Sequence, residues 1–216
     1  MKILLPPSEG KTMPTKSKAL SLAALSFHKD LATARAKIIN EHKEIDFKHC
    51  DLASNIYSGV LYQALNYSSL SAKAQVRADD TILIFSAAFG LLRLSDPIPY
   101  YKVKIDPSIW RKPLADALFE YSDELIVDCR SSTYSTVWTP NPQNTVGVRV
   151  FKNVDGARKV ITHMSKQTRG HVARFLVSES SPPGTPQQLL QVMQKEFNCS
   201  LIAPEGKKTW FLDVIL

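Results

Sequence analysis

Four short apolar runs constrain this chain more than any other feature, because each one ends abruptly in polar and charged residues. The runs span residues 2–5, 81–85, 125–127 and 160–162, and the polar segments after them span 6–11, 86–93, 128–134 and 163–170. Short runs rich in Ile, Leu and Val are typical of buried strands. Ligands of open α/β sheets bind outside strand ends. The sequence therefore predicts four strand ends that converge on one site.

The composition is that of an ordinary globular protein, with 216 residues, 44% hydrophobic and 22% charged. A chain of this length buries about 70% of its unfolded surface. We expect an α/β (mixed α+β) fold, with a central, mostly buried sheet flanked by helices in a single compact domain, 1–216. No apolar run approaches the roughly 20 residues that span a bilayer, and the first residues do not form a signal peptide. We therefore expect a cytoplasmic protein without a membrane partner.

Helix formers without Gly or Pro, and amphipathic spacing, predict four helices. These lie at 19–42, 110–121, 168–178 and 187–197. Thr185 can cap the last of them, with Pro186 at its first position. Apolar segments at 146–150 and 159–162 flank Asn153-Val-Asp-Gly156 and indicate a hairpin. Short strands are expected at 200–203 and 209–214.

The three cysteines, Cys50, Cys129 and Cys199, are far apart and are expected to be reduced, mostly buried thiols. Cys129 lies within a polar segment, so a reactive thiol is the alternative interpretation there. No His or Cys pair has zinc spacing. Gly10-Lys11-Thr12 lacks the first glycine of a phosphate loop. The sequence therefore predicts neither a metal nor a cofactor.

Several charged residues of the polar segments have two readings. Arg130 can bind a phosphate or carboxylate ligand, or it can pair with Asp128 inside the protein. Lys166, Arg169 and Arg174 form a basic strip at the expected start of a helix, where backbone donors favour anions. The alternative is a solvated basic face.

Five segments, in order along nearly the whole chain, resemble the YaaA family of peroxide stress proteins. They are Leu4-Leu-Pro-Pro-Ser-Glu-Gly-Lys-Thr12, Tyr57-Ser-Gly-Val-Leu-Tyr-Gln-Ala-Leu65, Ser86-Ala-Ala-Phe-Gly-Leu-Leu-Arg93 with Asp96 and Ile98-Pro-Tyr-Tyr101, Asp128-Cys-Arg-Ser-Ser-Thr-Tyr134, and Lys166-Gln-Thr-Arg-Gly170 with Arg174. Each motif alone is weak, but the ordered set is specific.

The resemblance implies a cytoplasmic protein that limits oxidative damage linked to free intracellular iron, with a YaaA-like fold, a positively charged cleft and DNA binding. The residues expected to line the cleft are Ser8, Glu9, Lys11, Tyr57, Gly59, Ser86, Gly90, Arg93, Asp96, Tyr101, Arg130, Ser131, Tyr134, Lys166, Arg169, Gly170 and Arg174. Longer members carry a helix-hairpin-helix element in their N-terminal third. Residues 31–52 of this chain lack an evident Gly-x-Gly hairpin.

Two functions stay open. A formal net charge of +7 favours anionic partners, so the first is DNA binding by phosphate contacts without sequence preference. The second is an enzyme pocket for a small anionic or nucleobase-like substrate. Acidic and phenolic groups beside the cations favour such a pocket. In either case, Arg174 is expected to point inward beside Gly170.

Overall fold

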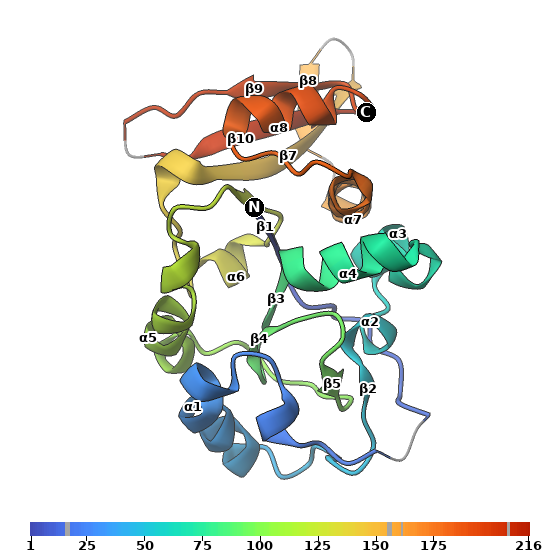
Figure 1. The fold of residues 1–216 in the computed structure, drawn as a ribbon, viewed down its shortest axis with the longest axis vertical. Helices are drawn as coiled ribbons and strands as arrows, with labels where there is room; N and C mark the ends of the chain where they lie inside the picture. The colour runs from blue at the N-terminus through green and yellow to red at the C-terminus, as the bar shows by residue number, and fades with distance from the viewer. Residues whose placement is uncertain (16–17, 155–156, 161, 207) are drawn as a thin grey trace.

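A central sheet of eight strands organises the computed structural model, which describes residues 1–216 except 16–17, 155–156, 161 and 207. The strand order is β4-β3-β1-β6-β7-β10-β9, and β8 pairs with β7 (Figure 1). The strands are β1 (Lys2–Leu5), β3 (Ile82–Ser86), β4 (Gly90–Leu92), β6 (Ile126–Asp128), β7 (Thr145–Val154), β8 (Ala157–Val160), β9 (Cys199–Ile202) and β10 (Trp210–Ile215). The short strands β2 (Asp51–Leu52) and β5 (Pro97–Ile98) pair separately.

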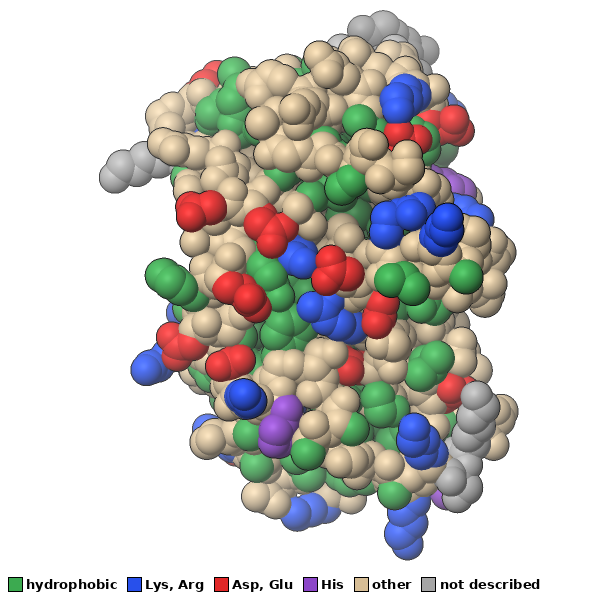
Figure 2. All heavy atoms as spheres, in the orientation of Figure 1, with side chains coloured by type: hydrophobic (Ala, Val, Ile, Leu, Met, Phe, Trp, Pro, Cys, Tyr) green, Lys and Arg blue, Asp and Glu red, His purple; other side chains and the backbone are tan. Residues whose placement is uncertain are grey.

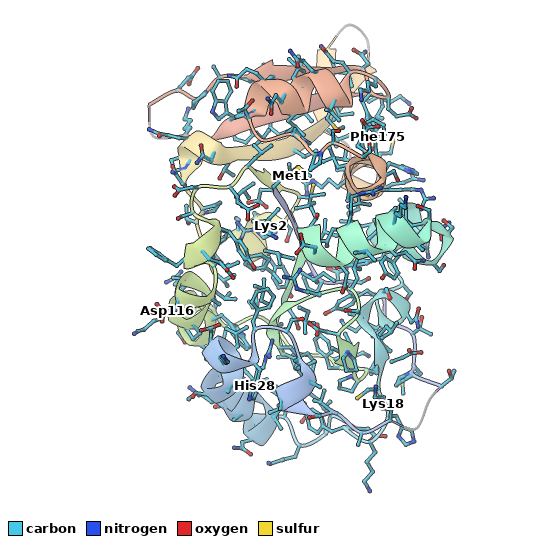
Figure 3. All side chains as sticks on the ribbon, viewed as in Figure 1. Met1, Lys2, Lys18, His28, Asp116 and Phe175 are labelled. Carbon is cyan, nitrogen blue, oxygen red and sulfur yellow. The ribbon has the colours of Figure 1, made fainter. Side chains whose placement is uncertain are left out.

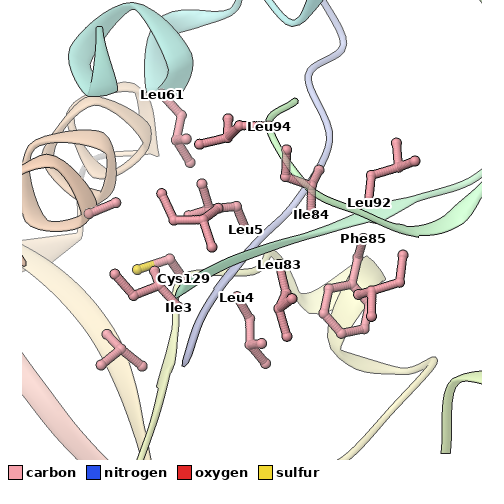
Figure 4. Close-up of a cluster of buried hydrophobic side chains, with 14 of the residues drawn as sticks. Ile3, Leu4, Leu5, Leu61, Leu83, Ile84, Phe85, Leu92, Leu94 and Cys129 are labelled. Atoms are coloured by element: carbon pink, nitrogen blue, oxygen red, sulfur yellow. The ribbon is translucent and has the colours of Figure 1, made fainter. Parts of the chain in front are cut away.

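The middle of the sheet is parallel, which fixes where the polar segments meet. β1 lies between β3 and β6, with Leu4 opposite both Leu83 and Asp128. All four residues of β1 are buried, as near-continuous apolar strands covered on both faces should be. Their side chains pack with those of β3 and the helices (Figure 4). The carboxyl ends of β1, β3 and β6 therefore lie at one edge of the sheet.

Helices cover both faces of this sheet. The α-helices are α1 (His28–Glu41), α2 (Ala53–Ile56), α3 (Val60–Leu65), α4 (Ala72–Thr81), α5 (Pro107–Ala117), α6 (Ser132–Ser135), α7 (Thr162–Ser178) and α8 (Pro186–Met193). In Figure 1, α3, α4 and α7 lie on one side of β1, and α5 lies on the other. Among the described residues, none of these helices combines the length and the apolar character that a bilayer crossing needs.

The predicted fold class is confirmed, and so are most of the predicted elements. Three of the four predicted strands are β1, β3 and β6, and the hairpin is β7–β8, whose turn at 155–156 lies outside the described residues. Thr185 caps α8 through a hydrogen bond from the Gln188 amide. The helix at 19–42 is wrong in its first part. Phe27 has a left-handed backbone (φ 59°), so α1 begins only at His28.

The fourth strand is also predicted wrongly. The apolar run at 160–162 contains the end of β8, which is antiparallel to β7, and the start of α7 at Thr162. The polar residues that follow therefore lie on a long helix and not after a parallel strand. This helix still reaches the carboxyl edge, because α7 packs on both α3 and β7.

The opposite, amino edge of the sheet carries interspersed charges. The Met1 ammonium pairs with Glu124 at 2.6 Å, and the Lys2 ammonium donates to the Asp80 carbonyl. Met1 and Lys2 lie near the centre of the view in Figure 3. Figure 2 shows acidic and basic side chains side by side around an apolar patch in this region. The amino edge is thus a mixed surface and not a basic one.

Candidate functional site at the carboxyl ends of three strands

The loop after β1 is tied to the segment before α3. Lys11 forms an isolated antiparallel bridge with Tyr57, and the Gly59 amide donates to Ser8 Oγ at 2.8 Å. A side chain at Gly59 would overlap Ser8 Oγ, so this close approach requires glycine. The Lys11 ammonium turns back and donates to the Ser8 carbonyl at 2.6 Å. These contacts place Lys11 over the carboxyl edge of the sheet.

Beneath Lys11 lies a buried chain of hydroxyl groups. The phenols of Tyr57 and Tyr101 share a hydrogen bond of 2.7 Å, and the Tyr101 phenol shares one of 2.8 Å with Ser86 Oγ. Ser86 Oγ also accepts from the Phe89 amide. Burial raises the pKa of both phenols well above their usual range. The two phenols are therefore proton donors and not phenolates at physiological pH.

Lys11 has the electrostatic setting of a reactive amine. Its ammonium lies 4.5 Å from the centre of the Tyr101 ring and 5.9 Å from that of Tyr57, as in cation–π contacts. Burial lowers the pKa of Lys11, Glu9 opposes this effect, and Lys102 adds to it. Desolvation disfavours the charged form of a lysine. Lys11 therefore gives up its proton more readily than a surface lysine.

Arg130 lies at the same edge, but the protein itself satisfies it. Its guanidinium binds both carboxylate oxygens of Asp128, at 3.0 and 2.8 Å, and its side chain is only 1% exposed. The Phe85 ring lies 4.4 Å from the guanidinium and the Trp138 ring 5.8 Å. Of the two interpretations of Arg130, the internal pair with Asp128 is the one observed. Arg130 organises the end of β6 and does not offer a free cation.

Ser131 and Tyr134 follow Arg130 and are both half-buried. The Ser131 carbonyl accepts from the Tyr134 amide in the first turn of α6. Burial, and secondarily Glu9, raises the pKa of Tyr134 to about 12. Tyr134 also contributes to the raised pKa of Tyr101, so its phenol lies close to the buried hydroxyl chain.

Helix α7 contributes Arg169 and Lys166 to this edge. The Arg169 guanidinium donates to the carbonyls of Val148 and Arg130. The Lys166 ammonium lies 3.9 Å from a carboxylate oxygen of Glu9, and both side chains are exposed. Cys129 lies beneath them in the core. Burial raises the pKa of its thiol to about 12, Arg169 opposes this rise and Asp128 adds to it, so a reactive thiolate is disfavoured there.

We use the name strand-end site for the predicted residues that come together at this edge. They are Ser8, Glu9, Lys11, Tyr57, Gly59, Ser86, Tyr101, Arg130, Ser131, Tyr134, Lys166 and Arg169. Lys11 is half-buried, and Glu9 and Lys166 line the exposed rim.

Arg93 does not join the strand-end site, contrary to the prediction. It follows β4, which is antiparallel to β3, so it emerges at the amino edge. There its guanidinium donates to the carbonyls of Asp79 and Asp80, at the end of α4. Asp96 also lies apart from the site, because it accepts hydrogen bonds from Ser26 and from the Arg93 amide. The prediction failed for Arg93 because the polar segment after β3 contains β4, which carries the chain back to the amino edge.

Two predicted glycines are required for packing. Gly90 has a left-handed backbone (φ 72°), and a side chain there would overlap the Trp110 ring. Gly170 lies where α7 crosses α3. A methyl group on it would overlap the Leu61 carbonyl oxygen and lie 2.8 Å from Ala64 Cβ. Protein atoms, and not a ligand, therefore occupy the space beside both glycines.

Arg174 lies beyond that crossing. Its guanidinium donates to the carbonyls of Leu65 and Asn66, at the end of α3. Those carbonyls have no partner within the helix. The predicted inward orientation is thus found, but Arg174 points at a helix end and not into the strand-end site.

Sequence analysis missed three contributors to the site. Tyr62 donates its phenol to the Pro6 carbonyl, Lys102 is close enough to lower the pKa of Lys11, and Trp138 stacks against Phe85. Tyr62 lies within the segment 57–65, and its spacing from Tyr57 was the available signal. Lys102 and Trp138 lie in loops without periodicity, so no pattern pointed to them.

In the described residues, no three His, Cys, Asp or Glu side chains are close enough together to hold a metal ion.

A family model described as peroxide stress protein YaaA matches residues 1–201. The chain belongs to the peroxide stress protein YaaA family. Because the match covers most of the chain, it takes in every residue of the strand-end site. The family's description supports a role in peroxide stress.

Curated relatives align with this chain over 61% to 100% of its length. A "UPF0246 protein" of Streptomyces coelicolor is 31% identical over 259 aligned positions, which cover 100% of this chain and 98% of the relative. A "UPF0246 protein" of Corynebacterium glutamicum is 29% identical, over 90% of this chain and 92% of its own. An uncharacterised protein of Campylobacter jejuni is 35% identical over 61% of this chain and 58% of its own. Their names specify no reaction, so the chemistry must be argued from the residues.

Proposed function

We propose that this protein acts in peroxide stress by binding a small anionic or nucleobase-like compound at the strand-end site, with Lys11 as the reactive cation. The observation that carries the proposal is the setting of Lys11. Its ammonium lies above the Tyr101 ring, it is held by the Ser8 carbonyl, and burial lowers its pKa. Ionisable groups that are held in one position and have perturbed pKa values are characteristic of functional sites.

The neighbours of Lys11 suit a reaction as well as binding. A lysine with a lowered pKa can accept a proton or attack an electrophile. The phenols of Tyr57 and Tyr101 remain protonated, and their hydrogen bonds to each other and to Ser86 hold the ring surface beneath Lys11 in place. On the rim, Tyr134 offers a phenol and a ring face against which a planar base can stack. The site is therefore equipped for an anionic or aromatic ligand and for acid–base chemistry.

Native mass spectrometry of protein taken directly from cells tests this proposal. We expect the wild-type chain to retain a small ligand and Lys11→Met to lose it, because the substitution removes the charge but keeps an unbranched side chain. Lys73→Met is the matched control, since Lys73 is exposed on α4. In cells lacking the endogenous gene, Lys11→Met should fail to restore survival in hydrogen peroxide. Full survival, with no retained ligand on the wild-type chain, would refute the proposal.

A second candidate function is DNA binding by a basic surface at the same edge. Exposed Lys102 and Lys166 flank Lys11, and the formal net charge is +7. By contrast, Arg93, Arg130 and Arg169 already bind protein acceptors. Phosphate contact would thus depend on the lysines, and such contacts carry no sequence preference.

Fluorescence anisotropy of a short labelled DNA tests this second candidate. The logarithm of affinity should fall with the logarithm of salt, with a slope of about −0.9 for each phosphate neutralised. The double variant Lys102→Glu, Lys166→Glu should bind far more weakly, and the control Lys73→Glu should bind like the wild type. DNA binding is excluded if no complex forms at low salt.

We also propose that the protein works in the cytoplasm and that its link to free intracellular iron depends on the strand-end site. Support comes from the family resemblance alone. Chelatable iron measured in cells should be higher with Lys11→Met than with the wild-type chain during peroxide exposure. Equal iron levels in the two would separate the iron effect from this site.

A further inference from the structure

A groove of about 350 Å³ lies between α3 and α7, next to the strand-end site but lined by none of its residues. The two helices touch at Gly170, where the missing side chain lets α7 approach the Leu61 carbonyl. The small side chains of Val60 and Ala64 line the groove beside this contact. Figure 1 shows α3 and α7 side by side. The volume is at the lower end of the range for small-molecule sites.

The walls of the groove offer hydrogen-bonding groups from both helices. Gln63 and Asn66 come from the α3 side, and Gln167 and His171 come from α7. Gln63 uses its amide N–H on the Ser58 carbonyl, which leaves its oxygen free to accept. In the part of the chain that the structure describes, the side chains of Asn66, Gln167 and His171 bond to no protein group. A ligand can therefore meet amide and imidazole groups that need not first break a protein contact.

Arg174 closes one end of the groove. Only Nη1 of its guanidinium is engaged, with the carbonyls of Leu65 and Asn66. Within the described residues, Nε and Nη2 have no protein acceptor. These two nitrogens have the spacing that binds phosphate or carboxylate in a bidentate manner. The two carbonyls meanwhile hold the guanidinium in place, so its orientation is fixed before a ligand arrives.

The chain around the groove contains no acidic residue. Residues 57–78 include Lys73 and Arg77, and residues 162–178 include Lys166, Arg169 and Arg174, but neither segment includes Asp or Glu. The whole protein has 20 Asp and Glu among 216 residues, so about four would be expected in these 39 positions at the average usage. No carboxylate from either helix therefore competes for the free guanidinium nitrogens, and the local charge favours an anion.

We propose that this groove is a second binding site, which takes a small ligand with an oxyanion head group. The phosphate or carboxylate of the ligand lies against Arg174 and His171. Its uncharged part lies over Val60 and Ala64 and hydrogen-bonds to the amides of Gln63 and Gln167. This site is independent of the strand-end site, because Lys11 does not line it.

Calorimetric titration of the full chain at low salt tests the proposal, with inorganic phosphate, adenosine monophosphate and citrate as separate probes. We expect at least one probe to bind. Binding of phosphate and the nucleotide identifies a phosphate head group, and binding of citrate alone identifies a carboxylate. Gln167→Glu should weaken the probe about tenfold or more, because it places a carboxylate beside the bound anion.

Gln187→Glu is the matched control, since it makes the same change on an exposed position of α8. It should leave affinity within about twofold, which corresponds to roughly 0.4 kcal/mol. The same titrations are run on Lys11→Met, which removes the cation of the strand-end site, so the probe binding that this variant retains belongs to the groove and is separate from the proposal for the strand-end site. Three results would overturn the groove: no binding of any probe, equal weakening by Gln167→Glu and Gln187→Glu, or loss of binding in Lys11→Met.

Discussion

Gly170 on α7 lies directly against the carbonyl oxygen of Leu61 on α3, with no room for a side chain between them. The contact is backbone to backbone, so the neighbour cannot move aside as a flexible side chain would. It brings together two residues that are 109 positions apart in the sequence (170 − 61). Helix α7 carries Lys166 and Arg169 of the strand-end site, and both helices carry residues that line the groove. This single crossing therefore sets the spacing of both sites.

Gly170→Ala is therefore expected to destabilise the protein. Alanine in a helix interior usually gains about 1 kcal/mol over glycine, but overpacking a core costs about 1–3 kcal/mol. We expect a net loss of up to about 2 kcal/mol in the free energy of unfolding in urea, because α7 must shift. Gly184→Ala is the control, since the nearest atom to its added methyl group is 3.5 Å away. A neutral or stabilising Gly170→Ala would show that the helices separate easily.

Arg174→Ala and Arg77→Ala should both lower stability. Arg174 binds carbonyls at the end of α3, and Arg77 binds the carbonyls of Val177 and Ser178 at the end of α7. Loss of hydrogen bonds from a charged donor costs about 1–2 kcal/mol at such half-buried positions. Thermal melts without ligand measure this, and Lys73→Ala should stay within about 0.5 kcal/mol of the wild type. If Arg77→Ala leaves the melting temperature unchanged, water replaces the hydrogen bonds that Arg77 donates to Val177 and Ser178.

Asp128→Ala should be the most damaging change at the strand-end site. It removes the partner of Arg130, whose guanidinium remains buried between Phe85 and Trp138. Leaving one member of a buried ion pair without its partner costs about 3–5 kcal/mol. Asp116→Ala, on the exposed side of α5, is the matched control in urea unfolding. If both variants unfold alike, the Arg130 pair contributes little to the fold.

Lys11 should have a lower pKa than an ordinary lysine, and this should make the stability of the protein depend on pH. In the folded state its pKa is lowered from the usual 10.5, so between the lowered value and 10.5 the unfolded chain binds more protons. Stability then rises with pH through this window. Competitive acetylation at several pH values, normalised to the plateau for each residue, should give an earlier midpoint for Lys11 than for Lys73. Coincident midpoints would remove the case for a reactive Lys11.

The sequence predicted the sheet well because its signal is local. Residues 3–5 and 82–85 are apolar at every position, and a strand buried on both faces explains apolar runs of that length. The polar residues directly after them were placed correctly for the same reason. Lys11, Ser86 and Arg130 all lie at the carboxyl edge, because a parallel sheet brings those ends together.

The predictions that failed were those that depended on strand direction or on contacts with residues distant in the sequence. Nothing near Arg93 indicates that β4 runs antiparallel, yet that reversal moves its guanidinium to the other edge of the sheet. The choice between a ligand and Asp128 as the partner of Arg130 needed side-chain geometry. The left-handed Phe27, which delays α1, has no glycine to reveal it. Long-range contacts override local preference at each of these positions.

The position of β10 has a consequence for synthesis of the chain. β10 lies between β7 and β9 and pairs with β7 over six residues in parallel register. Until Trp210–Ile215 leaves the ribosome, β7 exposes an unpaired edge to other nascent chains, and such edges are prone to aggregation. Parallel pairing over long sequence separations is also slow. During translation, the part of the sheet built from β3, β1, β6 and β7 therefore keeps an open flank at β7 until β10 pairs there.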